Sequence, residues 1–482
     1  GMTGAFVMGA AAAAVNSITG GAGADTLLGA GIASTLSGGA GIDAITGGAA
    51  TDTINGGAGN DTLNGSAATG TTEDTVNGEA GNDTFQYTDA QLAAGVTLNG
   101  GDGTDVLSIQ NLSAVADSQL ANKSSIETLT SAATGLSATL DDNAQAMGIA
   151  TVTLAGTDAG GIADTVTIND GVTNALTVNI DTSVAADTNA VNASAYTGTL
   201  SIVAASATAL NVDAGVTSTL TGGTGTSDTL TTVGGTFTAA QLASVTAIEN
   251  WTVSDDTTSS FTLADANIAD GVALTIDGRA IINASNSLTV VGTLEADGAL
   301  TVHGSTGGDA LTGTASDLGD TLYGYAGGDT FSFAVDNLTT LDTVDGGAGS
   351  DTVTITAAGT LADADLTNVT NVEALTFTAA ATSATLGGQY QESGATTITL
   401  TTGTNSLTLG AAADSGGGVT NDQTLNLVGG TDTIDAALHT GSLTVAYADD
   451  DNLTAADTIT ASSTGTDILS VTMAGGAALT AA

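Results

Sequence analysis

The chain of 482 residues has no cysteine and no proline, and only two of its side chains, Lys123 and Arg279, are basic, against 51 acidic ones. Because cysteine is absent, no disulfide can hold the fold together, so burial of apolar groups or a bound ligand has to stabilise it. Because proline is absent, no residue lacks the backbone N–H that strand pairing uses. The formal net charge of −49 disfavours a nucleic-acid partner, since phosphate binding depends on basic side chains.

Long apolar stretches are also missing. No run reaches the roughly 18 apolar residues needed to cross a bilayer, so we predict no transmembrane segment. The longest apolar run, residues 4–15, lacks the basic flank of a secretory signal, and we interpret residues 1–19 as an N-terminal segment that could have been cut from a longer chain. Hydrophobic residues still make up 41% of the sequence, so its acidity does not indicate disorder, which requires low hydrophobicity as well as high charge.

Glycine is abundant and is arranged in nonapeptides of the form G-G-x-G-x-D-x-U-x, where U is a large apolar residue. Residues 20–64 contain such segments in tandem, alternately complete and damaged. Complete copies begin at Gly20, Gly38, Gly56, Gly100 and Gly346, and near-complete copies begin at Gly78, Gly304 and Gly324. Tandem copies at a fixed spacing are far more specific than a single copy.

This array resembles the RTX family of calcium-binding repeats. In that family two nonapeptides form each turn of a right-handed solenoid, the β-roll, so residues two nonapeptides apart stack on the same side. The resemblance implies that several Ca²⁺ ions lie between successive turns, held by aspartate carboxylates and turn carbonyls. An excess of carboxylates without basic partners also favours Ca²⁺, which prefers all-oxygen ligands. We expect contributing carbonyls near Gly20, Gly38, Gly56, Gly100 and Gly346.

The aspartates of the repeats recur at intervals of two nonapeptides in the tandem array and at slightly longer intervals beyond it, which predicts that they stack in columns. The predicted calcium ligands in these columns are Asp25, Asp43, Asp61, Asp83 and Asp105 in the first block, and Asp309, Asp329 and Asp351 in the second. On the opposite side of the first block, Ser34 and Asp52 form a column that is degenerate or holds a weaker site. Asp228, in an altered copy that begins at Gly222, is a further candidate ligand.

Three glutamates, Glu127, Glu249 and Glu373, follow the columns at nearly equal separations and mark a longer repeat. The turns before them lack the glycines, so we interpret these glutamates as structural or solvated carboxylates. Lys123 and Arg279 are each expected to pair with a local carboxylate, which contributes little at a surface.

Apolar residues precede the glutamates at every third position, as in Leu366, Val369 and Val372, which predicts a short helix or 3₁₀ turn. Trp251 and Phe331 are predicted to fill the core. The two histidines have no second histidine or cysteine nearby, so we predict no metal-binding or catalytic role for them.

Short alternating segments, rich in β-branched residues and bounded by Gly, Asn, Asp and Thr, fill the rest of the chain and are typical of strands and turns. The predicted fold is all-β: a right-handed parallel β-solenoid, or RTX β-roll, with turns of about 18–22 residues and short helical or 3₁₀ insertions, which could form several lobes. The predicted blocks are the N-terminal segment (1–19), RTX block 1 (20–109), a solenoid (110–221), a second long repeat (222–303), RTX block 2 (304–355) and a C-terminal solenoid (356–482).

The sequence contains no H-E-x-x-H or G-x-S-x-G motif, no cysteine nucleophile and no P-loop, so we predict no enzyme and no cofactor besides Ca²⁺. The phrases VNASAYTGTLSI (191–202), NVTNVEALTF (368–377) and GGAGSDTVTI (346–355) resemble those of bacterial surface-layer (S-layer) proteins that contain RTX repeats. That resemblance implies a structural protein exported by type I secretion to the bacterial cell surface. It also implies self-assembly into a lattice and, through a region not identified, attachment to cell-surface polysaccharide.

Two other functions stay open. The chain could be the calcium-stabilised stalk of a secreted RTX adhesin or of an extracellular matrix protein. It could also be the calcium-folding tail of a secreted hydrolase, which would require a catalytic block of different composition.

Overall fold

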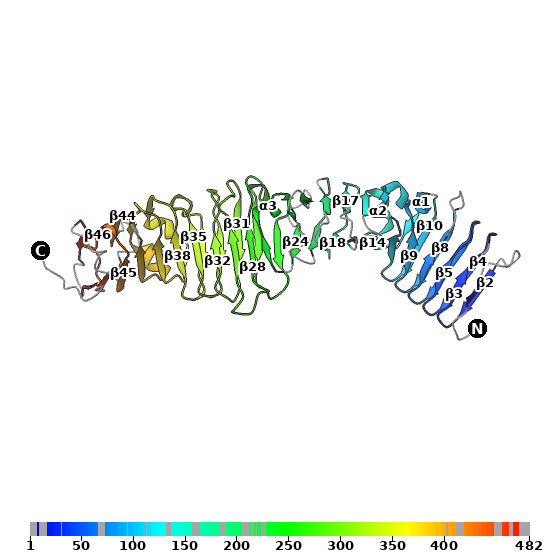
Figure 1. Cartoon of the computed structure of the whole chain (residues 1–482), viewed down its shortest axis with the longest axis horizontal. Helices are drawn as coiled ribbons and strands as arrows, with labels where there is room; N and C mark the ends of the chain where they lie inside the picture. Colours follow the sequence, from blue (N-terminus) through cyan, green and yellow to red (C-terminus); the bar gives the residue numbers. More distant parts are fainter. Residues whose placement is uncertain are drawn as a thin grey trace. The chain divides into compact units, whose positions relative to one another are not determined.

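The computed structural model shows two compact units, which we describe separately. Unit 1 comprises residues 1–232 and 244–248, and unit 2 comprises residues 233–243 and 249–482. Each unit is a stack of short strands that run side by side (Figure 1). The structure describes residues 7–8, 17–29, 31–65, 73–93, 95–111, 113–131, 136–156, 164–182, 189–193, 195–204, 212–213, 216–217, 219–222, 228–232, 234–401, 403–410, 419–447, 456–461 and 466–471.

Unit 1 consists of three parallel sheets, between which the chain alternates as it advances. Sheet A contains β1 (Val7–Met8), β3 (Thr26–Leu28), β5 (Ala44–Thr46), β7 (Thr62–Asn64), β9 (Thr84–Tyr87), β11 (Val106–Ile109), β14 (Thr128–Ser131), β16 (Thr151–Gly156), β18 (Leu176–Thr182), β20 (Leu200–Ala204) and β24 (Thr229–Thr232). Sheet B contains β2 (Ser17–Gly21), β4 (Thr35–Ala40), β6 (Thr53–Ala58), β8 (Thr75–Ala80), β10 (Thr97–Asp102) and β13 (Lys123–Ser124). Sheet C contains β12 (Ser113–Val115), β15 (Leu136–Leu140), β17 (Asp164–Ile168), β19 (Asn189–Asn192), β23 (Thr219–Thr221) and β26 (Val245–Thr246). A small antiparallel pair is formed by β21 (Val212–Asp213) and β22 (Val216–Thr217).

Unit 2 repeats this plan. Sheet D contains β27 (Asn250–Val253), β29 (Ala273–Asp277), β31 (Ala299–His303), β33 (Thr321–Tyr323), β36 (Thr343–Asp345) and β40 (Val369–Thr370). Sheet E contains β25 (Thr236–Phe237), β28 (Ser259–Thr262), β30 (Leu288–Val291), β32 (Ala310–Thr312), β35 (Thr330–Phe333), β38 (Thr352–Ile355), β41 (Ala374–Phe377), β43 (Thr397–Leu400), β45 (Gln423–Leu427), β47 (Leu443–Tyr447) and β49 (Ile468–Val471). Sheet F contains β39 (Thr360–Ala362), β42 (Ser383–Leu386), β44 (Gly403–Leu409), β46 (Gly430–Asp435) and β48 (Thr458–Thr460). A further short parallel pair is β34 (Ala326–Gly327) with β37 (Ala348–Gly349).

The strands pair in parallel and in register, so each residue lies over its counterpart in the next turn. Because side chains alternate along a strand, every second residue enters a thin core. The apolar residues two positions after the repeat aspartates stack in this way and are at most 1% exposed; in sheet A they are Leu27, Ile45, Leu63, Phe85 and Leu107. Trp251 and Phe331 are equally buried in unit 2, which confirms both core predictions.

The turns vary in length more than the sequence suggested. Leu36 pairs with Ile18 across a turn of two nonapeptides, whereas Leu230 pairs with Ile202 across a considerably longer turn. Register fixes only the strands, and lengthening a surface connection costs little entropy, so the expected upper limit of about 22 residues was too low.

Short helices occupy some of the connections. They are α1 (Asp89–Ala93), η1 (Asp117–Leu120), α2 (Asp142–Met147), α3 (Ala239–Leu242), η3 (Asp265–Asn267), η4 (Val335–Asn337), η5 (Asp363–Leu366) and α4 (Gly388–Ser393). The spacing of three before Glu373 predicted a helix over all three apolar residues, but η5 ends at Leu366 and Val369 already begins β40. All three residues are nevertheless buried: Leu366 at the end of the helix, Val369 in the strand and Val372 in the connection that follows it.

The structure therefore confirms an all-β parallel solenoid with short helical insertions. None of the helices in the described part of the chain has the length and apolar character needed to span a membrane. The finer block boundaries stay predictions, and most of the N-terminal segment lies outside the described residues.

Candidate calcium sites in the carboxylate columns

The first column, defined as Asp25, Asp43, Asp61, Asp83 and Asp105, runs along the start of the sheet-A strands. One carboxylate oxygen of Asp43 accepts the backbone N–H of Asp25 at 2.7 Å. The same bond, in which each aspartate accepts the N–H of the aspartate one turn earlier, recurs at 2.8 Å as far as Asp105. The regular spacing of these aspartates in the sequence thus corresponds to a continuous hydrogen-bonded column.

The second column, defined as Asp309, Asp329 and Asp351, stands at the start of strands β32, β35 and β38 in unit 2. Asp329 accepts the N–H of Asp309 at 2.7 Å, and Asp351 accepts that of Asp329 at 2.8 Å. All members of both columns are at most 2% exposed.

The other carboxylate oxygen in most of these corners has no partner. In six aspartates the buried Oδ2 accepts no hydrogen bond: Asp43, Asp61, Asp83, Asp105, Asp329 and Asp351. A buried polar atom without a partner costs about 1–3 kcal/mol, and more when it is charged. A bound ion or an ordered water would satisfy such atoms.

Charge adds to this cost. Neighbouring turns lie about 4.8 Å apart, so ionised carboxylates in a column repel one another strongly. Burial raises the pKa of Asp83 to about 6 and that of Asp329 to about 7. The hydrogen bond donated by the N–H of the preceding turn lowers each pKa in part, and the charges of the adjacent carboxylates in the column raise it.

Backbone conformation decides which oxygens are left without a donor. The residue four positions before each of the six aspartates has a positive φ. These residues are Gly39 (106°), Gly57 (117°), Glu79 (74°), Gly101 (108°), Tyr325 (70°) and Gly347 (88°). Where that residue does not have positive φ, its N–H donates to Oδ2 instead. Gly21 does so to Asp25 at 2.7 Å, and Gly48 to Asp52 at 2.6 Å.

Asp309 behaves like this second group. Ser305 replaces the second glycine of its repeat and donates both its N–H and its hydroxyl to the carboxylate, each at 2.6 Å. Of the predicted ligands, Asp25, Asp52 and Asp309 therefore already have protein donors on Oδ2, and the six with an unpartnered oxygen are the strongest candidates.

The first glycine of each repeat lines the space beside the unpartnered oxygen. A Cβ atom on Gly56 would lie 2.5 Å from Oδ2 of Asp61 and 2.8 Å from the carbonyl oxygen of Gly78 in the next turn. The same two kinds of oxygen face the corresponding position of Gly38 and Gly324. Carboxylate and carbonyl oxygens thus converge on a space that only glycine leaves open.

This donor set fits Ca²⁺. Calcium takes six to eight oxygen ligands from carboxylates, carbonyls and water. The unpartnered Oδ2 atoms and the turn carbonyls would hold it, and the bound ion would supply the positive charge that the stacked carboxylates lack. The carbonyls predicted near Gly38, Gly56 and Gly100 each face the glycine one turn earlier.

The opposite side of unit 1 carries the expected third column. Asp52 accepts the N–H of Ser34, and Asp74 accepts that of Asp52, each at 2.7 Å. The sequence pattern did not indicate Asp74, because no glycine repeat surrounds it. In unit 2 it likewise did not indicate Asp320, which accepts the N–H of Leu300 at 2.9 Å.

A shorter signal could have identified the missed residues. The tripeptide Asp-Thr-apolar begins at Asp74, Asp164, Asp320, Asp342 and Asp432, all of which are buried. Asp228 has the same tripeptide, is fully buried and accepts the N–H of Leu200 at 2.9 Å. Residues 223–227, which complete its altered repeat, lie outside the described residues.

Glu127 and Glu373 end the columns. Glu127 accepts the N–H of Asp105 at 2.8 Å, and Glu373 accepts that of Asp351 at 2.7 Å. The corners before these glutamates are three residues shorter than the corners before the aspartates. Before Glu127, Ser125 (φ of 52°) takes the place of the first glycine. Ser125 precedes Glu127 by two residues, whereas the first glycine of a repeat precedes its aspartate by five. The longer side chain of glutamate makes up for the shorter corner and still reaches the N–H of the preceding turn. This supports the prediction that these glutamates are structural.

The basic side chains differ from each other. Arg279 pairs with Asp277 at 2.6 Å, as predicted. Lys123 pairs with no carboxylate of the described residues; it is buried and donates to the carbonyls of Val96 and Ala121 at 2.9 and 3.0 Å. That prediction was wrong because Lys123 occupies a core-facing corner, where burial lowers its pKa to about 8.

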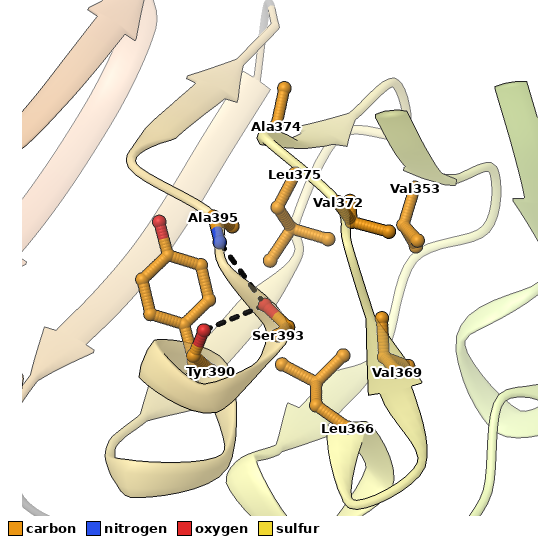
Figure 2. Close-up of a pocket in the computed structure, with 9 residues that line it drawn as sticks. All are labelled: Val353, Leu366, Val369, Val372, Ala374, Leu375, Tyr390, Ser393 and Ala395. Atoms are coloured by element: carbon orange, nitrogen blue, oxygen red, sulfur yellow. Dashed lines mark hydrogen bonds between the residues drawn. The ribbon is translucent and has the colours of Figure 1, made fainter. Parts of the chain in front are cut away.

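A small pocket lies beside α4 in unit 2 (Figure 2). Its lining is apolar except for Tyr390 and Ser393. The Ser393 hydroxyl donates to the carbonyl of Tyr390 at 2.7 Å, and the Tyr390 hydroxyl donates to Gln423 at 2.8 Å. Both hydroxyls serve the packing of α4 against the solenoid, and the pocket offers no acid–base pair.

Comparison with known families identifies the repeats. The model of the RTX calcium-binding nonapeptide repeat matches in four copies, at residues 13–31, 33–63, 66–86 and 342–354. The chain therefore carries calcium-binding RTX repeats, which bind several Ca²⁺ ions, and this confirms the predicted cofactor. Asp105, Asp309 and Asp329 lie outside the matched residues but make the same column hydrogen bonds. A search of the curated proteins gave no match.

We predict that Asp61→Asn separates the two roles of its carboxylate. The amide oxygen can still accept the N–H of Asp43, but the NH₂ group removes the charge and the free Oδ2. Calcium-dependent stabilisation should fall by about 2.7 kcal/mol if the ion is present at about 100 times its Kd, while stability in chelator should not fall. Urea unfolding with and without Ca²⁺ measures both. Asp170→Asn, at an exposed turn, is the control, and equal calcium effects in the two variants would contradict the assignment.

Gly56→Ala should block a site by size alone. The added Cβ would meet Asp61 and the Gly78 carbonyl, so we expect a loss of more than about 2 kcal/mol and a higher calcium concentration at the folding midpoint. At Gly31 an added Cβ meets nothing within 4 Å, and Gly31→Ala should change stability by less than about 0.5 kcal/mol. Calcium titrations followed by circular dichroism compare the two variants, and similar midpoints would refute the glycine-lined site.

Without metal, the protein should be more stable in mild acid than in mild base. Because the pKa values of Asp83 and Asp329 are raised to about 6 and about 7, from about 3.9 in the unfolded chain, their contribution to stability is complete below about pH 4 and is lost as pH rises through the folded pKa values. Thermal unfolding in chelator at pH 5 and pH 8 tests this. A melting temperature that is independent of pH, or higher at pH 8, would show that these carboxylates are not buried in the metal-free protein.

Proposed function

We propose that the chain is a structural, calcium-binding protein of the bacterial cell surface that self-assembles into an S-layer lattice. The observation that carries the proposal is the continuity of one architecture: parallel strands recur through both units, up to β49, and buried carboxylates occupy many of their corners. The proposal also draws on the sequence resemblance to S-layer proteins.

Charge supports assembly through cations. Of the 51 acidic residues, many lie outside the buried columns, and Arg279–Asp277 is the one ion pair within the described ranges. Two such surfaces repel unless cations lie between them. Millimolar Ca²⁺ outside the cell would provide those cations and would also fill the columns.

The same dependence favours an extracellular location. The columns bury several carboxylates that calcium would neutralise, so binding energy becomes folding energy. A chain kept unfolded at low cytosolic Ca²⁺ would suit type I secretion and would fold after export.

An adhesin or matrix stalk is the second candidate function. The uninterrupted strand ladders favour it as well, because a solenoid whose turns contact only their neighbours makes a suitable spacer. The two functions differ in whether copies of the chain form ordered sheets.

We expect negative-stain electron microscopy to show ordered sheets after millimolar Ca²⁺ is added to chelated protein. Replacing four exposed aspartates outside the columns, Asp170, Asp270, Asp317 and Asp336, with asparagine should abolish the sheets and leave the circular dichroism spectrum in Ca²⁺ unchanged. Wild-type particles that fold but stay dispersed would favour the stalk. Sheets that survive chelation would refute calcium-dependent assembly.

A further inference from the structure

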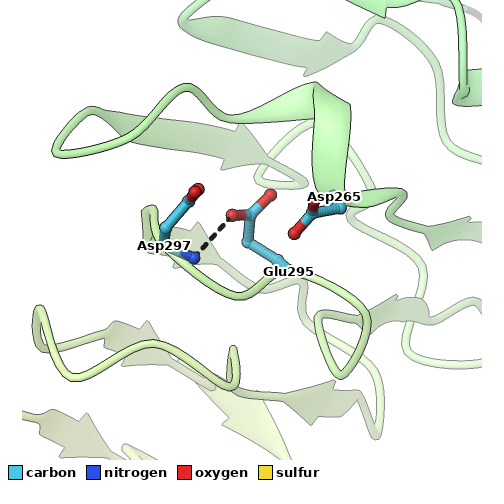
Figure 3. Close-up of side chains that lie close together, drawn as sticks. All are labelled: Asp265, Glu295 and Asp297. Atoms are coloured by element: carbon cyan, nitrogen blue, oxygen red, sulfur yellow. Dashed lines mark hydrogen bonds between the residues drawn. The ribbon is translucent and has the colours of Figure 1, made fainter.

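Three carboxylates outside the columns meet at one corner of unit 2 (Figure 3). Asp265 begins η3, after strand β28, whereas Glu295 and Asp297 lie between β30 and β31. Because β28 and β30 are paired neighbours in sheet E, the connections that follow them come to the same corner of successive turns. One carboxylate oxygen from each residue lies within 4.8 Å of the other two.

Glu295 distinguishes this corner from an ordinary acidic surface cluster. Its side chain is completely buried. One of its oxygens accepts the N–H groups of Asp297 and Gly298 at 3.2 and 3.0 Å, whereas Oε2 has no partner. Figure 3 shows the Glu295 carboxylate between the side chains of Asp265 and Asp297, so the unpartnered oxygen belongs to the group on which the other two converge.

The surrounding chain fixes the carboxylates and offers them no counter-charge. The N–H of Ala296 donates to Asp265 at 3.2 Å, and the carbonyl of Glu295 accepts the N–H of Ala315 at 2.7 Å. Of the two basic residues of the chain, Lys123 belongs to unit 1 and Arg279 is paired with Asp277. Burial raises the pKa of Glu295, and the charges of Asp265 and Asp297 also raise it, against the lowering effect of the two N–H bonds.

We propose that Asp265, Glu295 and Asp297 bind one Ca²⁺ ion that links two successive turns outside the nonapeptide repeats. The unpartnered oxygen of Glu295 supplies the buried ligand. Asp265 and Asp297 are exposed, which leaves room for water to complete the six to eight oxygens that calcium takes. The site has no glycine repeat, so its existence does not depend on the columns or on lattice assembly.

The test compares Glu295→Gln with the matched variant Glu392→Gln in the full-length protein. Glutamine keeps an oxygen for the N–H groups of Asp297 and Gly298 but removes the charge. Glu392 is an exposed residue of α4, so its replacement makes the same change of charge elsewhere in unit 2. Equilibrium dialysis at saturating Ca²⁺ should find one ion fewer per chain in Glu295→Gln, and the wild-type number in Glu392→Gln.

Hydrogen exchange locates the loss. Calcium should slow exchange of the amides of residues 296–298 in the wild type and in Glu392→Gln, but not in Glu295→Gln. If Glu295→Gln does not fold, Asp297→Asn changes an exposed ligand and should raise the calcium concentration for protection of these amides about tenfold or more. Equal ion numbers in the two glutamine variants, or protection at the wild-type calcium concentration in Asp297→Asn, would overturn the proposal.

Discussion

The hydrogen bond that a backbone N–H donates to the buried carboxylate one turn later is the interaction on which the rest of this solenoid depends. In-register parallel pairing places each residue over its counterpart, so one aspartate at a corner becomes a column of like charges. The bond satisfies one oxygen of each carboxylate and fixes the register of the corner. What satisfies the second oxygen then determines whether that turn requires metal.

The backbone conformation before each aspartate determines whether its second carboxylate oxygen has a protein donor. A residue without positive φ four positions before the aspartate, such as Gly21 or Gly48, donates its own N–H and replaces the ion. With positive φ the second oxygen stays open. Glu79 and Tyr325 adopt this conformation without being glycine, at a cost of about 1–3 kcal/mol each, and the neighbouring turns impose it. The calcium-binding form thus extends to repeats that have lost their second glycine.

The columns and the apolar stacks beneath them could be predicted from the sequence. The regular intervals between the aspartates are enough to show which residues lie over one another in successive turns. The repeat pattern could not reveal Asp74 or Asp320, since the column bond needs only an aspartate before a strand and no glycine. Lys123 stands where the other long repeats have Val245 and Val369, whose side chains face inward. We nevertheless predicted a surface charge for it, because lysine is rarely fully buried. A structural role for Glu127 and Glu373 could be predicted from the missing glycines, but the column bond that each of them accepts could not.

Calcium dependence in this chain is therefore local and not uniform. Each unit contains corners with an unpartnered oxygen, and also corners in which the protein supplies the donor, as Gly48 does for Asp52 at 2.6 Å and Thr314 does for Asp320 at 2.7 Å. In a solenoid each turn is stabilised mainly by its neighbours. Turns with their own donors can thus fix the register of neighbouring turns, and calcium bound at those neighbouring turns completes the ladder. A column of calcium sites would then extend the paired strands along the chain, starting from corners whose carboxylates have protein donors.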